Sequence, residues 1–215
     1  MRTRLFCISI MALAAACLPG TQAAANLLVN GSFEDATNFL DNTGQDTMNV
    51  DLGSTAMTGW TVTGSHFVSW IGPGNPFLLT ASNGGYFVDL TGYLHGAPFG
   101  GVSQTISTTA GATYQLRFDL GSSSIYGLPS GITASAGSSS QTFTSADTGA
   151  NNWETETFDF VAGGPTTTIS FLGDQGLEYT GLDNVSVALA MQEPVSFGVL
   201  AAGLAALGTA RYRRR

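Results

Sequence analysis

The amino-acid sequence predicts an all-β domain, and three observations support this prediction. Apolar and polar residues alternate with the period of two that marks a half-buried strand, most clearly from 114 to 120. Segments rich in Gly, Pro, Asn and Asp separate about ten such stretches. No stretch between 26 and 190 shows the period of an amphipathic helix. These patterns favour a two-sheet antiparallel sandwich of jelly-roll type over a parallel α/β sheet.

The expected strands follow one another at short intervals, and residues that favour turns bound them. Asn30-Gly31 closes the first strand, Pro73 to Pro76 follow the third, and Gly163 to Pro165 precede the tenth. The polar segment 37–55 is expected to be a long loop or a pair of turns. No unit repeats at a fixed period, which argues against a propeller or a solenoid. The expected strands are 27–30, 59–63, 67–71, 86–90, 101–107, 114–120, 131–136, 141–144, 154–161, 166–172 and 181–188.

Residues 1–25 have the features of a secretory signal peptide. Two arginines precede an apolar stretch at 5–18, and the alanines at 23 and 25 offer a cleavage site before Asn26. Both cysteines lie in this segment, so a chain cut there has no thiol for disulfides or thiolate metal sites. Lipidation at Cys17 is the alternative, because residues 13–17 loosely resemble a bacterial lipobox.

Residues 26–190 form one domain of ordinary size with a strongly acidic charge balance. Fourteen of the 15 Asp and Glu residues lie in this domain, and Arg117 is the one of seven basic residues found there. Such a domain is repelled by nucleic acid and by anionic membrane surfaces, whose binding needs clustered Lys and Arg. The same charge attracts divalent cations.

Residues 191–215 form a second targeting segment. Glu193 and Pro194 precede an apolar run at 195–210, and four arginines lie within 211–215. A helix over the apolar run would rise about 24 Å, less than the roughly 30 Å hydrocarbon core of a bilayer. The arginines would keep the C-terminus in the cytoplasm. We expect a weak, transient span, with a permanent anchor and a final core helix as alternatives.

This short motif, weak span and arginine cluster resemble the PEP-CTERM sorting signal of Gram-negative bacteria that make extracellular polysaccharide. The resemblance implies processing by an exosortase, which cuts near Glu193 and Pro194 and delivers the protein to the cell surface or the extracellular matrix. Membrane contact would then be confined to the tail. Gln192 stands where the first Pro of the motif is usual.

The domain between the two targeting segments carries an ordered set of short motifs. They are Asn30-Gly31-Ser32-Phe33-Glu34, Gly59-Trp60, 101–106, 111–118 and 181–187. The set resembles galactose-binding-like sandwiches, in particular bacterial choice-of-anchor C modules and a related plant cell-wall family labelled as a domain of unknown function. More distantly, it resembles carbohydrate-binding modules of xylanases and cellulases.

That resemblance implies a structural Ca²⁺ ion held by the acid after the opening motif and the Asp of the closing motif. The matching residues are Glu34 and Asp183. Ca²⁺ takes six to eight oxygen ligands, so backbone carbonyls, waters or Asp35 would complete the set. The alternative is that both are ordinary acids at loop edges.

Aromatic residues are the candidate saccharide-binding groups, because Trp and Tyr faces pack against the apolar faces of pyranose rings. Trp70, Tyr93 and Tyr126 lie beside predicted loops and are the candidates for this role, with Tyr86 and Trp153 less favoured. Arg117 is a candidate clamp or, alternatively, a surface ion pair with its neighbour Asp119. His66 and His95 are expected in solvent. The expected core aromatics are Trp60, Tyr114, Phe118, Phe158, Phe160 and Phe171.

The sequence contains no nucleophile elbow, zinc-protease motif or phosphate-binding glycine loop, and no Lys. We therefore expect no enzyme, but a secreted envelope or matrix protein that binds carbohydrate weakly. A purely structural or adhesive matrix protein is the alternative. A carboxylate-pair glycosidase is a second alternative, through Glu154 with Glu156 or Asp89 with Asp119. A binding module predicts a loop pocket with exposed aromatics, and a glycosidase predicts two carboxylates about 5–10 Å apart in a cleft.

Overall fold

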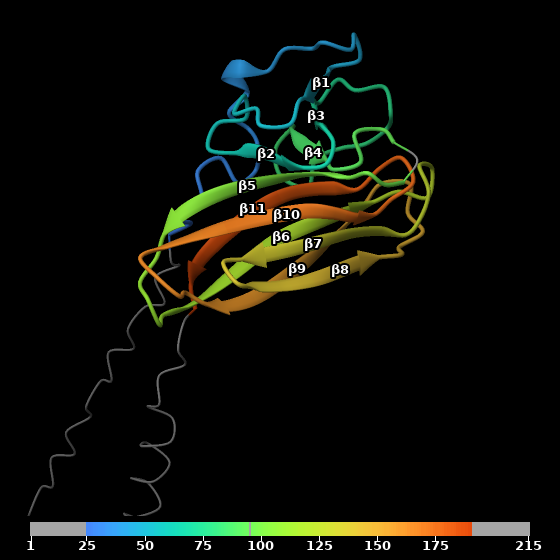
Figure 1. Cartoon of the computed structure of the whole chain (residues 1–215). Coiled ribbons are helices and arrows are strands. Elements are labelled where there is room, and N and C mark those ends of the chain that lie inside the picture. The colour runs from blue at the N-terminus through green and yellow to red at the C-terminus, as the bar shows by residue number, and fades with distance from the viewer. Residues whose placement is uncertain (1–24, 95, 191–215) are drawn as a thin grey trace, which may run out of the picture.

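The computed structural model describes residues 25–94 and 96–190 and shows two stacked antiparallel sheets (Figure 1). One sheet has six strands in the order β1-β3-β4-β11-β6-β9, and the other has five in the order β2-β5-β10-β7-β8. The predicted antiparallel sandwich is thereby confirmed. The expected signal peptide, the sorting tail with Glu193 and Pro194, and His95 lie outside the described residues. Among the described residues, no helix is long and apolar enough to cross a membrane.

The strands match most of the expected segments within a few residues. One 3-10 turn, η1, spans Ala36–Asn38. The strands are β1 Thr47–Val50, β2 Thr61–Gly64, β3 Val68–Ile71, β4 Phe87–Asp89, β5 Gly100–Ser107, β6 Thr113–Ser122, β7 Ser130–Ala136, β8 Ser139–Ser145, β9 Asn152–Val161, β10 Thr166–Gln175 and β11 Gly181–Leu189.

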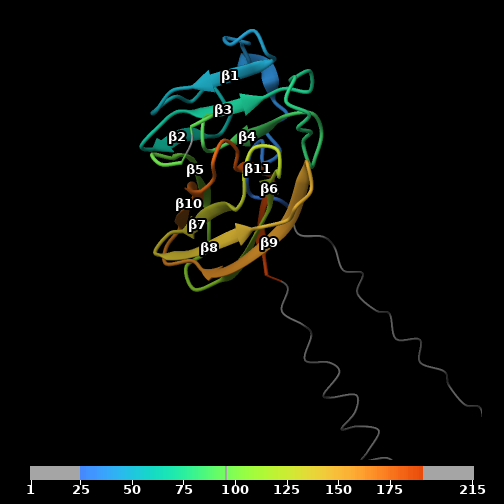
Figure 2. The same cartoon turned by 90° about the vertical axis from the view of Figure 1, so that its right-hand side faces the viewer.

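The main hydrophobic core lies between the two sheets. Alternate residues of β6 face it, and Phe118 packs edge-on against Phe143 and Phe171, with ring centroids 5.2 and 5.0 Å away. Burying each such side chain contributes about 1.5–3 kcal/mol. β8 and β9, the outermost strands of their sheets, lie side by side in Figure 2. The aromatics predicted for the core are all buried, namely Trp60, Tyr114, Phe118, Phe158, Phe160 and Phe171.

Two expectations about the N-terminal part were wrong. Residues 27–30 form no strand, because the backbone turns at Asn30, whose φ is 53°, and only isolated hydrogen bonds join this segment to β11. The expected loop at 37–55 contains η1 and the edge strand β1. Thr47 and Val50 of β1 are buried where they pair with Ile71 and Val68 of β3, so a short polar segment completes the sheet.

A second, smaller core lies on the outer face of the six-stranded sheet. The segment 72–86, which joins β3 to β4, folds over this face and buries apolar side chains that the alternation of β3 and β4 would leave in solvent. The buried members are Ile71, Leu79, Phe87 and Tyr179, with Phe77, Ala81, Tyr126 and Trp153 packed against them. The candidate site lies at the border of this core.

Candidate functional site

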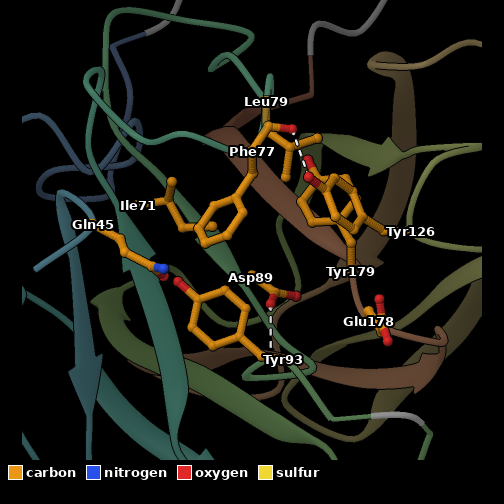
Figure 3. Close-up of a pocket in the computed structure, with 9 residues that line it drawn as sticks. All are labelled: Gln45, Ile71, Phe77, Leu79, Asp89, Tyr93, Tyr126, Glu178 and Tyr179. Carbon is orange, nitrogen blue, oxygen red and sulfur yellow. Dashed lines mark hydrogen bonds between the residues drawn. The ribbon is translucent and has the colours of Figure 1, made fainter. Parts of the chain in front are cut away.

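A pocket of about 340 Å³ opens beside the second core, and loops from several parts of the chain build it (Figure 3). Three partly exposed aromatic rings form its walls, aliphatic side chains form its base, and a carboxylate lies at its floor. Its volume is at the lower end of the roughly 300–1,000 Å³ of small-molecule sites. The lining residues are Gln45, Ile71, Phe77, Leu79, Asp89, Tyr93, Tyr126, Glu178 and Tyr179.

Asp41 folds the loop that carries Gln45 to the pocket. Its carboxylate accepts hydrogen bonds from the backbone N–H groups of four residues, 43 to 46, at 2.8–3.2 Å. Partial desolvation disfavours the charged carboxylate, but these donors outweigh it and lower the pKa of Asp41 to about 2. Asp46 then joins this loop to the next one, because its carboxylate accepts the Gly74 N–H at 2.6 Å.

Asn75 shapes the loop that carries Phe77. The amide nitrogen of Asn75 donates to the carbonyls of Gly72 and Leu79 at 2.8 and 2.9 Å, and its amide oxygen accepts the Phe77 N–H at 3.2 Å. Such side-chain hydrogen bonds satisfy backbone groups that have no partner in a β-ladder, and they fix the shape of the loop. Phe77 is thus held over the sheet although it belongs to no regular element.

Among the three aromatic side chains that form the walls, Phe77 contacts the other two. The ring of Phe77 lies 5.6 Å from that of Tyr93 and 6.2 Å, nearly perpendicular, from that of Tyr126. The Tyr126 hydroxyl donates a 2.8 Å hydrogen bond to the Phe77 carbonyl. In Figure 3 the rings of Phe77 and Tyr93 border the space above Asp89, and Tyr93 points toward Gln45. Burial raises the pKa of both tyrosines, so they remain neutral hydrogen-bonding groups.

Asp89 lies at the floor of the pocket and is completely buried. Its carboxylate accepts the N–H groups of Thr91 and Thr180, both at 3.0 Å, and that of Tyr93 at 3.3 Å. Burial raises the pKa of Asp89, these donors oppose the rise, and the resulting pKa is about 6.

Tyr93 has a backbone φ of 64°, which is unusual for a residue with a large side chain. Such a conformation costs on the order of 1–3 kcal/mol and persists only where its surroundings hold it. The Asp89 carboxylate, which accepts the Tyr93 N–H, is one such constraint. Strain of this kind clusters at ligand-binding positions.

The structure brings together two of the four predicted ligand-binding residues. Tyr93 and Tyr126 come from different connections and both line the pocket. Trp70 does not: it is 0% exposed and packs against Phe39 and Tyr86 in the main core, so the prediction of an exposed stacking face was wrong. Trp70 is buried because its side of β3 faces the main core between the sheets, whereas segment 72–86 covers the opposite face of β3.

Arg117 lies away from the pocket, on β6. Its guanidinium donates to the Thr155 hydroxyl at 3.2 Å and lies 4.0 Å from the Asp119 carboxylate. Its side chain is 44% exposed, so this ion pair contributes at most about 1 kcal/mol. This geometry matches the surface ion pair that was the alternative to a ligand clamp.

Glu34 and Asp183, the predicted Ca²⁺ ligands, hold the same segment of chain. Glu34 Oε1 accepts the N–H groups of Gly85 and Tyr86 at 2.9 and 2.7 Å. Asp183 Oδ2 accepts those of Ser82 and Asn83 at 2.8 and 2.9 Å. Burial raises the pKa of Asp183 to about 7 although hydrogen bonds favour its ionised form.

Glu34 and Asp183 offer carboxylate oxygens, which are the type of ligand that a hard cation such as Ca²⁺ prefers. No group of three or more His, Cys, Asp or Glu side chains within 25–94 and 96–190 is placed to hold a metal. An ion bound by Glu34 and Asp183 would therefore take most of its oxygens from backbone and water. Calcium stays a prediction, in which the ion would fasten segment 82–86 to β11.

The carboxylate pairs considered for a glycosidase do not meet in the pocket. Glu154 and Glu156 lie on β9 and do not line it; burial first, and then the neighbouring charge of Glu154, raises the pKa of Glu156. Of the other pair, Asp89 lines the pocket, whereas Asp119 instead accepts hydrogen bonds from Ser82 and Thr155 on β6's outer side.

Sequence reasoning missed most of the pocket lining. Phe77 follows a run of turn residues, and an aromatic side chain in such a run is the signal that could have identified it. Gln45 and Glu178 carry no local signal, because they reach the pocket only through the fold.

Comparison with solved structures identifies similar folds. The TmCBM61 module, solved in complex with β-1,4-galactotriose, has a TM-score of 0.50 and 18% identity, covering 78% of this chain and 100% of that chain. A family 16 carbohydrate-binding module has a TM-score of 0.43 and 17% identity, covering 76% and 99% of the two chains. The xylan-binding CBM22-1 domain from Paenibacillus barcinonensis Xyn10C has a TM-score of 0.42 and 12% identity, covering 68% and 94%.

At 18% identity, the similarity to TmCBM61 is a similarity of fold alone. A search of curated proteins found no significant match. The family model described as "Protein of unknown function (DUF642)" matches residues 26–185. Since this match spans nearly the whole sandwich, the chain belongs to the DUF642 family.

Proposed function

We propose that this protein is a secreted, non-catalytic module that binds carbohydrate in the pocket of Phe77, Tyr93 and Tyr126. The observation that carries the proposal is the meeting of three aromatic side chains from three separate loops around one open cavity. A pyranose ring has an apolar face that packs on such rings and hydroxyls that need polar partners. Gln45 at the rim supplies an amide for those hydroxyls.

The size of the pocket suits a short stretch of a glycan rather than a long chain. A few stacking and hydrogen-bonding contacts give modest affinity, because binding also orders the ligand. Polysaccharide-binding proteins compensate through repeated ligand units and many protein copies on one matrix. Weak binding at each pocket is therefore compatible with firm retention in a matrix.

The absence of catalysis is part of the proposal. A general acid or nucleophile must reach the glycosidic bond. Of the two carboxylates that line the pocket, Asp89 and Glu178, Asp89 is 0% exposed and already accepts three backbone N–H groups, so the two do not form an exposed pair. This arrangement supports a structural role for Asp89, which holds Tyr93 in place.

The proposed location is the cell surface or exopolysaccharide matrix of a Gram-negative bacterium. The signal peptide at 1–25 and the PEP-CTERM-like tail at 191–215 support it, with an exosortase as the processing partner. An exported polysaccharide would then be the ligand that the module meets.

A glycan array probed with the purified protein, with and without Ca²⁺, tests the proposed function. We expect binding to at least one oligosaccharide class, and loss of that signal in Phe77→Ala. Leu78→Ala is the matched control, because Leu78 is 75% exposed and does not line the pocket. Silence across the array in both conditions would leave the purely structural alternative.

A further inference from the structure

We propose that the pocket prefers a saccharide with a positive charge, namely one that contains an unacetylated amino sugar. This inference rests on the proposed function, since it names the class of sugar that the same site takes. It follows from the charge of the pocket lining, the geometry of the aromatic rings and the position of the buried carboxylate.

In the described part of the chain, the ionisable groups that line the pocket are all acidic or phenolic. Asp89 and Glu178 are the carboxylates, and Tyr93, Tyr126 and Tyr179 are the phenols. Among the described residues the sole Lys or Arg is Arg117, which lies on β6 against Thr155 and Asp119 and not at the pocket. A negatively charged sugar, such as a uronic acid, would be repelled by the Asp89 carboxylate and would meet no Lys or Arg from residues 25–94 and 96–190 at the pocket.

The aromatic rings of the pocket offer faces that attract a cation. Phe77 packs on Tyr93 and Tyr126 at ordinary contact distances and all three line the pocket, so an ammonium group over an open ring face would be attracted to it. The negative face of each ring attracts such a group, and the attraction grows where water is excluded. A neutral hydroxyl at the same position gains no such energy.

Asp89 adds a formal charge beneath the rings. Its carboxylate is stabilised by N–H dipoles, and no cationic side chain among the described residues pairs with it. A buried carboxylate that lacks a counter-ion attracts a cation more strongly than an exposed one, because less solvent screens it. Direct contact is not required, since the charge acts through the low-dielectric floor of the pocket.

An amino sugar combines these requirements in one ligand. Its ring offers an apolar face for stacking, its hydroxyls match the amide of Gln45, and its ammonium group suits the rings and the acidic floor. An N-acetylated sugar keeps the ring and the hydroxyls but loses the charge.

Calorimetry on the purified protein with three tetrasaccharides of the same linkage tests the inference. The ligands are the β-1,4-linked tetramers of glucosamine, N-acetylglucosamine and glucose. We expect the glucosamine tetramer to bind about tenfold more tightly than either neutral tetramer, as expected for a cation over an aromatic face and near a buried carboxylate. Similar affinities for all three would overturn the charge preference and leave the carbohydrate site intact. Failure of every saccharide on the array and in calorimetry would overturn the proposed function itself.

An acidic protein also attracts cationic oligomers without a specific site. Two matched variants therefore distinguish binding at the pocket from attraction by the overall charge of the protein. Asp89→Asn is expected to remove most of the preference for the glucosamine tetramer. Asp159→Asn removes the same charge from the exposed side of β9 and is expected to leave the preference unchanged. An equal effect of both variants would assign the preference to bulk charge and contradict the inference.

Phe77→Leu provides an independent test if Asp89→Asn does not fold. This variant keeps every charge and most of the apolar volume but removes one π face. We expect the glucosamine preference to fall severalfold while binding of the glucose tetramer changes less. A preference that persists at full size in Phe77→Leu would exclude a cation–π contribution from this ring.

Discussion

The Tyr126 hydroxyl donates a 2.8 Å hydrogen bond to the carbonyl oxygen of Phe77. This bond joins the connection between β6 and β7 to the segment that covers the outer face of the six-stranded sheet. Two walls of the pocket are therefore fixed relative to each other by one hydroxyl group.

Tyr126→Phe should loosen the pocket while keeping its aromatic lining. Loss of one neutral hydrogen bond costs about 0.5–1.5 kcal/mol of unfolding free energy. We expect a similar small loss of stability and a weaker affinity for saccharide, measured by denaturation and calorimetry. Tyr114→Phe is the control, because the Tyr114 hydroxyl accepts the Thr109 N–H at 2.9 Å and lies outside this pocket. Equal losses of saccharide affinity in both variants would show that the weaker binding does not depend on the hydrogen bond between Tyr126 and Phe77.

The raised pKa of Asp89 predicts a pH-dependent stability. The pKa is about 6 in the folded protein against a usual 3.8, so the folded state binds the proton more tightly than the unfolded state. The stability linked to this proton is fully present below pH 3.8 and is lost as the pH rises through about 6. The difference corresponds to at most about 3 kcal/mol. Asp183, with a pKa of about 7, acts in the same direction.

Thermal denaturation between pH 4 and pH 8 measures this dependence. We expect the midpoint to fall as the pH rises, and Asp89→Asn to show a distinctly flatter profile. The remaining slope in that variant is assigned to Asp183 and to the general repulsion among carboxylates. Identical profiles for the two proteins would show that Asp89 is not the group responsible.

The predicted calcium ion has its own test. If Glu34 and Asp183 hold Ca²⁺, the ion raises the melting temperature of the protein, because it binds only the folded chain. We expect a chelator to lower the melting temperature of the wild-type protein and to have no effect on Glu34→Gln. Asp174→Asn, an exposed acid on β10, should respond to chelator as the wild type does. If the chelator does not shift the wild-type melting curve, the prediction that Glu34 and Asp183 bind Ca²⁺ is contradicted.

The proposed signal peptide and sorting tail imply two cleavages in the native host. Signal peptidase should expose Asn26 as the first residue, and an exosortase should cut near Glu193 and Pro194. Intact-mass spectrometry of the protein released from the cell surface should therefore give a mass below that of residues 26–215. Recovery of the uncut C-terminus with its terminal arginines would support the permanent-anchor alternative.

Sequence periodicity predicted the long strands because each has one face in the main core and one toward solvent. It predicted β3 as well, but it did not predict that both faces of this strand are covered, so the expected exposure of Trp70 was wrong. Ser69, Trp70 and Ile71 are all buried, since Trp70 faces the main core while segment 72–86 covers the other side. β1 was missed because it is a four-residue edge strand within a polar segment.

The pocket was only partly predictable for a different reason. Tyr93 and Tyr126 could be chosen as aromatics beside turns, but their partners come from distant connections. Gln45 depends on the loop that Asp41 folds, and Phe77 depends on the bonds of Asn75. No spacing in the sequence records contacts of this kind, because they exist only after the sheets have brought the loops together.

The central claim is that the pocket beside the second core binds saccharide, and calorimetry tests it most directly. The titration uses the tetramers of glucosamine, N-acetylglucosamine and glucose, together with any class found on the array, against the wild type, Phe77→Ala and Leu78→Ala. The account predicts binding by the wild type and by Leu78→Ala, with an affinity at least about tenfold lower in a folded Phe77→Ala protein. Binding that Phe77→Ala leaves unchanged, or no binding to any saccharide, would contradict it.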